Sequence, residues 1–114
     1  MMRNNHISYI EFKTNDLVKT KEFYAKTFGW EFKDYGSAYA SFSESGVHGG
    51  FELSDKEVSN GALVVIYSKD LEYSEGKVVK NGGKITKEIF EFPGGRRFHF
   101  TDPTGNELGV WSDR

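Results

Sequence analysis

The side chains in this sequence whose types and positions could carry chemistry are carboxylates and imidazoles. The sequence contains no cysteine, which excludes a thiol nucleophile, a disulfide and a Cys-ligated metal. Glu52 lies four residues after His48, and Glu107 lies eight residues after His99. A positioned carboxylate or imidazole can exchange a proton with a bound substrate near neutral pH. We therefore predict Glu52, His48 and His99 as candidate catalytic residues, with Glu107 as a second carboxylate that could act with a histidine.

Each of these residues also has a purely structural interpretation. Glu52 could be a strand carboxylate that is solvated or paired with Lys13 or Arg97, which would leave it inert. His48 could lie at the edge of a loop, and His99 could satisfy a neighbouring polar group. A divalent-metal site built from His48, Glu52, His99 and Glu11 is a further alternative, since imidazoles and carboxylates suit such ions. Their spacing matches no ligand motif, which argues against this site, and we expect no cofactor.

Strands and helices must position these side chains, and hydrophobic periodicity locates them. The pattern predicts a helix over 16–28, capped by Asp16 and ended by Gly29, and a second helix that begins after Asp70 and ends at Gly82-Gly83. Residues 55–61 are polar and predict a connection. Strands are predicted at 6–13, 30–35, 38–43, 47–53, 62–68, 84–92, 96–101 and 107–111.

The order of these elements repeats. Asp16-Leu17 recurs as Asp70-Leu71, and Gly29 recurs as Gly83, with an offset of 54 residues in both cases. Each half is a strand, a helix and three strands, and a unit of about 50 residues is too small to stand alone. We therefore predict a single α+β domain over 1–114, made of one module at about 6–54 and another at about 61–112.

Composition excludes several classes of protein. The chain has 114 residues and a formal net charge of −2, which argues against a protein that binds nucleic acid or an anionic membrane surface. No apolar run approaches the ~20 residues that cross a bilayer, and the first residues do not form a signal peptide. We expect a cytoplasmic protein. The aromatic share of 16% requires rings in a core, a pocket or a partner surface.

The duplicated strand–helix–three-strand order, together with several short motifs, resembles the vicinal oxygen chelate superfamily, which includes glyoxalase I, bleomycin-resistance proteins and extradiol dioxygenases. This resemblance implies two βαβββ modules that form a rolled mixed sheet around a cavity. The motifs are Asn15-Asp16-Leu17, Phe23-Tyr24, Phe28-Gly29-Trp30, Asn81-Gly82-Gly83-Lys84 and the hairpin Phe100-Thr101-Asp102-Pro103-Thr104-Gly105-Asn106.

In the metal-using members of that superfamily, four strands each supply one His or Glu ligand. The resemblance places these positions at Tyr9, Glu52, Val64 and Gly109. Of these residues only Glu52 suits a divalent cation, since Val64 and Gly109 have no side-chain donor. The resemblance therefore predicts the family scaffold without the family metal.

Alternation along the strands extends this map to the lining of the cavity. We predict Tyr9, Glu11, Glu107, Trp111 and Arg97 as ligand-binding residues; the rest of the predicted lining is Lys13, His48, Glu52, Val64, Ile66, His99 and Thr101. Aromatic rings beside carboxylates favour a planar or cationic ligand. Arg96-Arg97 could together bind a carboxylate or phosphate, or could be a solvated pair at a hairpin edge.

Three functions are compatible with these features. The first is a metal-free protein that binds a small molecule, as the bleomycin-resistance branch does. The second is a lyase, isomerase or dioxygenase-like enzyme that uses Glu/His acid–base chemistry or an unconventional metal site. The third is an interaction subunit, and a homodimer is expected in all three cases.

Overall fold

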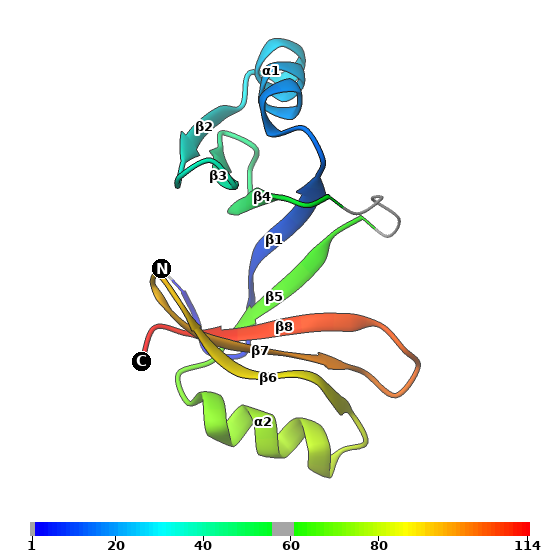
Figure 1. Ribbon diagram of the computed structural model, residues 1–114. Coiled ribbons are helices and arrows are strands. Elements are labelled where there is room, and N and C mark those ends of the chain that lie inside the picture. Colours follow the sequence, from blue (N-terminus) through cyan, green and yellow to red (C-terminus); the bar gives the residue numbers. More distant parts are fainter. Residues whose placement is uncertain (1, 56–60) are drawn as a thin grey trace. The chain divides into compact units, whose positions relative to one another are not determined.

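The computed structural model describes residues 2–55 and 61–114, so most of the connection predicted at 55–61 lies outside the described residues. The chain divides into two compact units, which are described separately (Figure 1). The N-terminal unit comprises Tyr9–Ala62, and the C-terminal unit comprises Leu63–Arg114 together with the residues up to Ser8.

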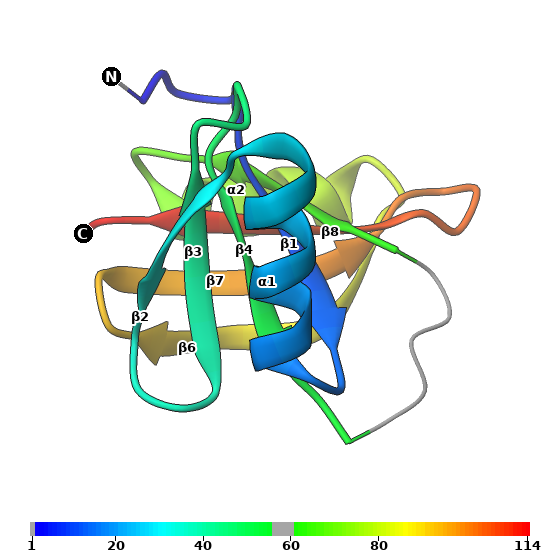
Figure 2. The same cartoon turned by 90° about the horizontal axis from the view of Figure 1, so that it is seen from above.

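The N-terminal unit is a mixed sheet of four strands with a helix on one face. The strand order is β2-β3-β4-β1; β1 and β4 are parallel, and the other neighbours are antiparallel. Figure 2 shows α1 running along the strands of this sheet. The elements are β1 (Ile7–Thr14), α1 (Leu17–Phe28), β2 (Glu31–Asp34), β3 (Tyr39–Ser43) and β4 (Gly49–Leu53).

The C-terminal unit repeats this plan. Its strand order is β5-β8-β7-β6; β5 and β8 are parallel, and β7 is antiparallel to both of its neighbours. The elements are β5 (Leu63–Tyr67), α2 (Leu71–Lys80), β6 (Lys84–Phe92), β7 (Gly95–Thr101) and β8 (Glu107–Ser112). The predicted α+β class and the repeated order of elements are confirmed.

Both helices begin at the aspartates that the sequence repeat identifies. Asp16 Oδ1 accepts a hydrogen bond of 3.0 Å from the backbone N–H of Lys19, and Asp70 Oδ1 accepts one of 3.1 Å from that of Tyr73. Each aspartate thus satisfies an N–H group that has no partner inside its helix.

A hydroxyl pair repeats beside these caps. The hydroxyls of Thr14 and Thr20 are 2.7 Å apart, and those of Ser68 and Ser74 are also 2.7 Å apart. Thr14 and Ser68 are both buried and lie 54 residues apart. The repeat is therefore conserved in hydrogen bonding as well as in the order of elements.

The two helices end differently. Gly29 caps α1 in the left-handed conformation, with a φ of 77°. The residue of this conformation after α2 is Gly82, with a φ of 96°, whereas Gly83 is not left-handed. The predicted equivalence of Gly29 and Gly83 is therefore off by one residue, because α2 is the shorter helix.

Each unit has its own core between helix and sheet. The buried residues are Leu17, Ala40, Phe42 and Phe51 in the N-terminal unit, and Leu71, Phe98 and Val110 in the C-terminal unit. Since side chains alternate across a strand, each sheet also has a face turned away from its helix, here called the far face. In the described part of the chain, no helix is long and apolar enough to cross a membrane.

Candidate functional site

The far face of the N-terminal unit carries a hydrogen-bonded group of three side chains. The Tyr9 and Tyr39 hydroxyls are 2.6 Å apart, and the Tyr39 hydroxyl donates to Glu11 Oε1 at 3.3 Å. Glu11 is only 5% exposed. Either tyrosine hydroxyl can donate across the 2.6 Å contact, and Tyr39 can donate to Glu11 only when Tyr9 is the donor to Tyr39. This hydrogen-bonded group, which runs from Tyr9 through Tyr39 to the buried carboxylate of Glu11, is called the tyrosine relay.

Gly50, on β4, makes room for this group. A Cβ atom at Gly50 would lie 2.5 Å from the Tyr39 hydroxyl oxygen and 2.7 Å from that of Tyr9. Both distances are too short for a real carbon–oxygen contact. The two hydroxyls therefore meet directly over Gly50, and a larger residue at this position would separate them.

Tyr39 remains protonated at ordinary pH. Burial raises the pKa of Tyr39 well above its usual range, and the hydrogen bond with Tyr9 and the negative charge of Glu11 raise it further. The Tyr39 hydroxyl is thus a hydrogen-bond donor and does not act as a base.

Glu52 and His48 have different surroundings in the structure. Glu52 forms an ion pair with Lys13 on the neighbouring strand, as one of its structural interpretations anticipates. His48 is exposed and precedes β4, where its backbone carbonyl accepts a hydrogen bond of 3.0 Å from Ile10. A surface hollow of about 500 Å³ is lined by His48 and Tyr9 but not by Glu52.

The far face of the C-terminal unit carries a row of cations and aromatic rings. The Arg97 guanidinium carbon lies 5.3 Å from the ring centroid of Phe90 and 5.5 Å from that of Phe92. Lys87 Nζ lies 4.8 Å from the Phe90 centroid, and the rings of Phe92 and Trp111 are 6.1 Å apart. The row crosses β6, β7 and β8, and cation–π contacts orient the guanidinium within it.

Trp111 ends this row in a fixed orientation. Its Nε1–H donates to Ser8 Oγ at 3.0 Å, and its ring meets that of Tyr67 edge to face at 5.3 Å. Tyr67 is held in turn by donating to Asp113 Oδ1 at 2.7 Å, a bond that raises the pKa of Tyr67. The indole is half-buried and anchored at its polar edge, which suits a ring that stacks on a ligand.

His99 and Glu107 lie close together on the same face. His99 Nδ1 is 3.8 Å from Glu107 Oε2, and Glu107 also accepts a hydrogen bond of 3.0 Å from Thr86. The His99 side chain is 12% exposed, whereas that of Glu107 is 51% exposed. Of the predicted acid–base pairs, this one has its two groups within reach of each other.

The structure disagrees with the alternative in which Arg96 and Arg97 together bind one anion. Arg96 points to the helix side, where Nη1 and Nη2 donate to the two carboxylate oxygens of Glu72 at 2.5 and 3.2 Å. The guanidinium lowers the pKa of Glu72, and the pair joins β7 to α2. Consecutive residues of a strand point to opposite faces, so only Arg97 lies on the far face.

The metal-ligand position assigned to β5 also needs correction. Val65, not Val64, pairs with Gly109, and Ile66 packs into the core beside Val110. Val64 and Ile66 are therefore not on the far face. A Cβ atom at Gly109 would lie 3.4 Å from His99 Cδ2, an ordinary van der Waals contact, so the backbone there has room for a methyl group.

The donor set at these positions does not fit the metal of the superfamily. Val65 and Gly109 offer no donor atom, and the carboxylate of Glu52 is engaged by Lys13. Within either unit, no group of three or more His, Asp or Glu side chains comes together among the described residues.

Sequence reasoning did not identify Tyr39, Phe90 and Phe92 as far-face residues. Tyr39 alternates with the buried Ala40 and Phe42, so strand periodicity could have found it. Phe90 and Phe92 are two residues apart on β6, where the pairing with β7 shifts register. Because of that irregularity, alternation along the sequence does not show on which face of the sheet the two rings lie.

The sequence matches the family model of the Glyoxalase/Bleomycin resistance protein/Dioxygenase superfamily over residues 6–110. The match covers most of the chain, so the protein belongs to this superfamily. The duplicated fold and the predicted resemblance agree with this assignment.

Among curated proteins, the chain is 26% identical over 118 aligned residues to the "Putative glyoxylase CFP32" of Mycobacterium bovis and of Mycobacterium tuberculosis. The alignment covers 91% of this chain but 44% of each relative, so the chain spans less than half of their length.

Solved structures share the fold at low sequence identity. The Mn(II)-bound glyoxalase from Novosphingobium aromaticivorans is 23% identical with a TM-score of 0.72, over 99% of this chain and 40% of that chain. A variant of Streptomyces coelicolor methylmalonyl-CoA epimerase in complex with 2-nitronate-propionyl-CoA is 17% identical with a TM-score of 0.71, over 96% and 98%. At such identities the likeness establishes the fold alone.

Proposed function

We propose that this protein binds a small molecule and works without the metal of its superfamily. The observation that carries the proposal is the row on the far face of the C-terminal unit, where Arg97 lies between two rings beside the anchored Trp111. Two of the inherited ligand positions, Val65 and Gly109, supply no donor atom. The residues that remain suit recognition of a ligand better than binding of an ion.

The chemistry of the row suggests a planar ligand with an anionic group. The Trp111 indole provides a surface for stacking, and a guanidinium can bind a carboxylate through two parallel hydrogen bonds. On the far face of the N-terminal unit, the polar groups proposed to contact a ligand are the Tyr9 hydroxyl and the Glu11 carboxylate. We propose Tyr9 and Glu11 as ligand-binding residues of the N-terminal unit, and Glu107, Trp111 and Arg97 as ligand-binding residues of the C-terminal unit.

An acid–base enzyme is the second candidate. The 3.8 Å separation of His99 and Glu107 supports this alternative, since a carboxylate that faces an imidazole can hold it in one orientation for proton transfer. His99 would exchange the proton with substrate, and Glu107 would orient it. The ion pair with Lys13 makes Glu52 the weaker candidate for a base.

Ligand binding is tested by thermal-shift measurements with a panel of planar carboxylates, planar cations and neutral analogues. Arg97→Gln should weaken binding of the carboxylates and leave binding of the neutral analogues unchanged. Arg96→Gln is the matched control, because it breaks a contact to Glu72 on the other face and should lower the melting temperature without changing affinity. If no compound raises the melting temperature in a dose-dependent way, the binding proposal fails.

Metal analysis of untagged protein tests the other half of the proposal. Dialysis against EDTA should leave the melting temperature unchanged. A stoichiometric divalent ion that is retained through purification and lost in Glu52→Gln would show that the protein holds a metal after all. Turnover of a substrate that survives EDTA but not His99→Gln would favour the enzyme.

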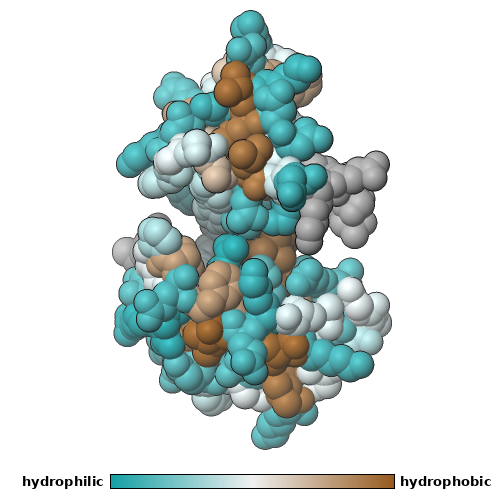
Figure 3. All heavy atoms as spheres, in the orientation of Figure 1, coloured by the Kyte–Doolittle hydropathy of each residue, from teal (hydrophilic) through white to brown (hydrophobic). Residues whose placement is uncertain are grey.

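We also propose a homodimer in the cytoplasm. Phe23 and Phe28 of α1 are 55% and 62% exposed, and their rings are 6.4 Å apart. Figure 3 shows separate hydrophobic patches among hydrophilic surface on the face in view. Aromatic side chains are enriched in interfaces between proteins. Light scattering of the purified protein measures whether two copies associate.

A further inference from the structure

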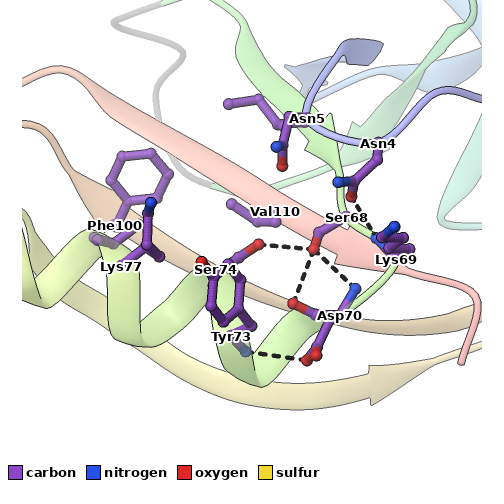
Figure 4. A pocket seen from close by; sticks show the side chains of 12 residues that line it. Asn4, Asn5, Ser68, Lys69, Asp70, Tyr73, Ser74, Lys77, Phe100 and Val110 are labelled. Carbon is purple, nitrogen blue, oxygen red and sulfur yellow. Dashed lines mark hydrogen bonds between the residues drawn. The ribbon is translucent and has the colours of Figure 1, made fainter.

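The helix side of the C-terminal unit contains a hollow that the proposed function does not use. It has a volume of about 620 Å³, which is within the range of small-molecule pockets. It lies between α2, the end of β5 and the residues Asn4 and Asn5 (Figure 4). The side chains that line it are on the opposite side of the sheet from Arg97 and Trp111.

One side of α2 forms a wall of this hollow. The wall residues are Asp70, at the helix cap, and Tyr73, Ser74 and Lys77, whose spacing of three and four residues places them on one side of a helix. The floor is apolar and consists of Ile66, Val78, Phe100 and Val110.

The internal repeat explains why space is left open above the apolar floor. Ile66 and Val78 lie 54 residues after Phe12 and Tyr24, and Ile66 pairs with Val110 as Phe12 pairs with Phe51. In the N-terminal unit these three positions hold aromatic rings.

The three rings are in contact with one another. The centroid of the Phe51 ring lies 5.3 Å from that of Phe12 and 5.4 Å from that of Tyr24. The C-terminal unit has an aliphatic side chain in place of each ring, so the space that the rings fill in one unit is left as a pocket in the other.

The rim of the hollow is cationic. Lys69 and Lys77 are exposed, and no carboxylate of the described residues lies within 4.0 Å of either ammonium group. The one acidic side chain of the lining, Asp70, accepts a hydrogen bond from the backbone of Tyr73 and so caps the helix. Asn4 Oδ1 accepts from the backbone N–H of Lys69 at 2.8 Å, which leaves its amide NH₂ group as a further donor.

We propose that this hollow binds a small amphipathic carboxylate, with its aliphatic chain on the apolar floor and its carboxylate at the cationic rim to which Lys69 and Lys77 contribute. Apolar burial supplies affinity for the chain, and the two ammonium groups select an anionic head group over a neutral one. The site is independent of the far faces, since it shares no residue with them.

The test is an NMR titration of the ¹⁵N-labelled protein with octanoate, and with octan-1-ol as the neutral probe of the same chain length. Octanoate should produce saturable shifts at the backbone amides of residues 4–5 and 66–78. The double variant Lys69→Gln/Lys77→Gln should weaken octanoate about five- to tenfold and leave octanol unchanged. Lys84→Gln, on the exposed start of β6, is the matched control and should bind octanoate as the natural sequence does.

A second variant fills the hollow with the residues of the other unit. Val78→Tyr/Val110→Phe should abolish the octanoate shifts while the remaining spectrum stays folded. If the double variant does not fold, Val78→Tyr alone serves the same purpose.

Three results would overturn the proposal. They are the absence of saturable octanoate shifts at these amides, equal binding of octanol and octanoate, and unchanged octanoate binding in a folded variant with the hollow filled. Arg97→Gln should leave octanoate binding unchanged, so this site and the proposed far-face site fail or succeed separately.

Discussion

Replacing Gly50 by alanine perturbs the tyrosine relay through a single methyl group. The new Cβ atom would lie 2.5 Å from the Tyr39 hydroxyl and 2.7 Å from the Tyr9 hydroxyl, so both must move. The Tyr9–Tyr39 hydrogen bond contributes about 1 kcal/mol, and the bond from Tyr39 to the Glu11 carboxylate contributes about 2 kcal/mol. Alanine also raises the free energy of unfolding by about 0.5–1 kcal/mol, because it restricts the unfolded chain more than glycine does. We therefore expect Gly50→Ala to lower the free energy of unfolding by about 2 kcal/mol.

Urea unfolding followed by tryptophan fluorescence measures this change. Gly76→Ala is the matched control, because Gly76 is in α2 and a Cβ atom there would meet nothing within 4 Å. The same substitution should raise stability at Gly76 by up to about 1 kcal/mol, since alanine favours the helix. The two alanine variants should thus have effects of opposite sign.

A double-mutant cycle assigns the loss to the relay. In a Tyr39→Phe background both hydrogen bonds are already absent, so Gly50→Ala should cost much less than it does in the natural sequence. If Gly50→Ala is harmless, or if it costs as much with Phe as with Tyr at position 39, the reasoning about the relay is wrong.

Three further predictions follow from local contacts. Gly95→Ala should cost more than about 3 kcal/mol in urea unfolding, because its Cβ atom would overlap a backbone carbonyl of β8, whereas Gly109→Ala should change stability by less than about 1 kcal/mol. Hydrogen bonds from the Asn106 side chain and backbone lower the pKa of Asp102 from 3.8 to about 2. The stability that these bonds give is therefore present above pH 3.8 and is lost as the pH falls through about 2. An NMR titration of Asn106→Ala should show the pKa of Asp102 nearer its usual value. Ser68→Ala should lose about 1–2 kcal/mol in the same urea assay, while Ser68→Thr should retain more of that stability because threonine occupies the equivalent position in the N-terminal unit.

Much of the fold was predictable because its signals are local. The aspartate caps and the glycine after α1 act on backbone groups within a few residues, so their types mark both helix starts and one helix end. The repeat then gave the order of helix and strands along the chain in each half. The bounds of the strands differ from prediction by only a few residues, since strand ends depend on pairing partners.

The phase of β5 was not predictable from its sequence. The strand is Leu-Val-Val-Ile-Tyr, and an almost continuous apolar run gives no alternation that would show which residues point to the helix. A shift of one residue moves every side chain to the other face, which is why Val64 and Ile66 were misplaced. By contrast, Glu107 and Trp111 of β8 were easier to assign, because they alternate with Leu108 and Val110.

The candidate site was predictable in part. Alternation placed Tyr9 and Glu11 on one face of β1, and the structure joins them through Tyr39. That partner is 30 residues from Tyr9 in the sequence, so no local pattern links them. The position of Arg97 between Phe90 and Phe92 likewise depends on strand pairing at an irregular register.

The C-terminal unit takes part of its structure from the other end of the chain. The backbone N–H of Asn5 donates to the carbonyl of Tyr67 at 2.7 Å, and Trp111 donates to Ser8, 103 residues away. During synthesis on the ribosome, residues 5–8 must therefore wait for β5 and β8 to emerge before they acquire these partners. The duplicated halves are consequently unequal as folding units, because the second needs residues 5–8 as well as its own strands. A circular permutant that joins residues 5–8 directly to the second half should fold faster, because far less loop-closure entropy is lost.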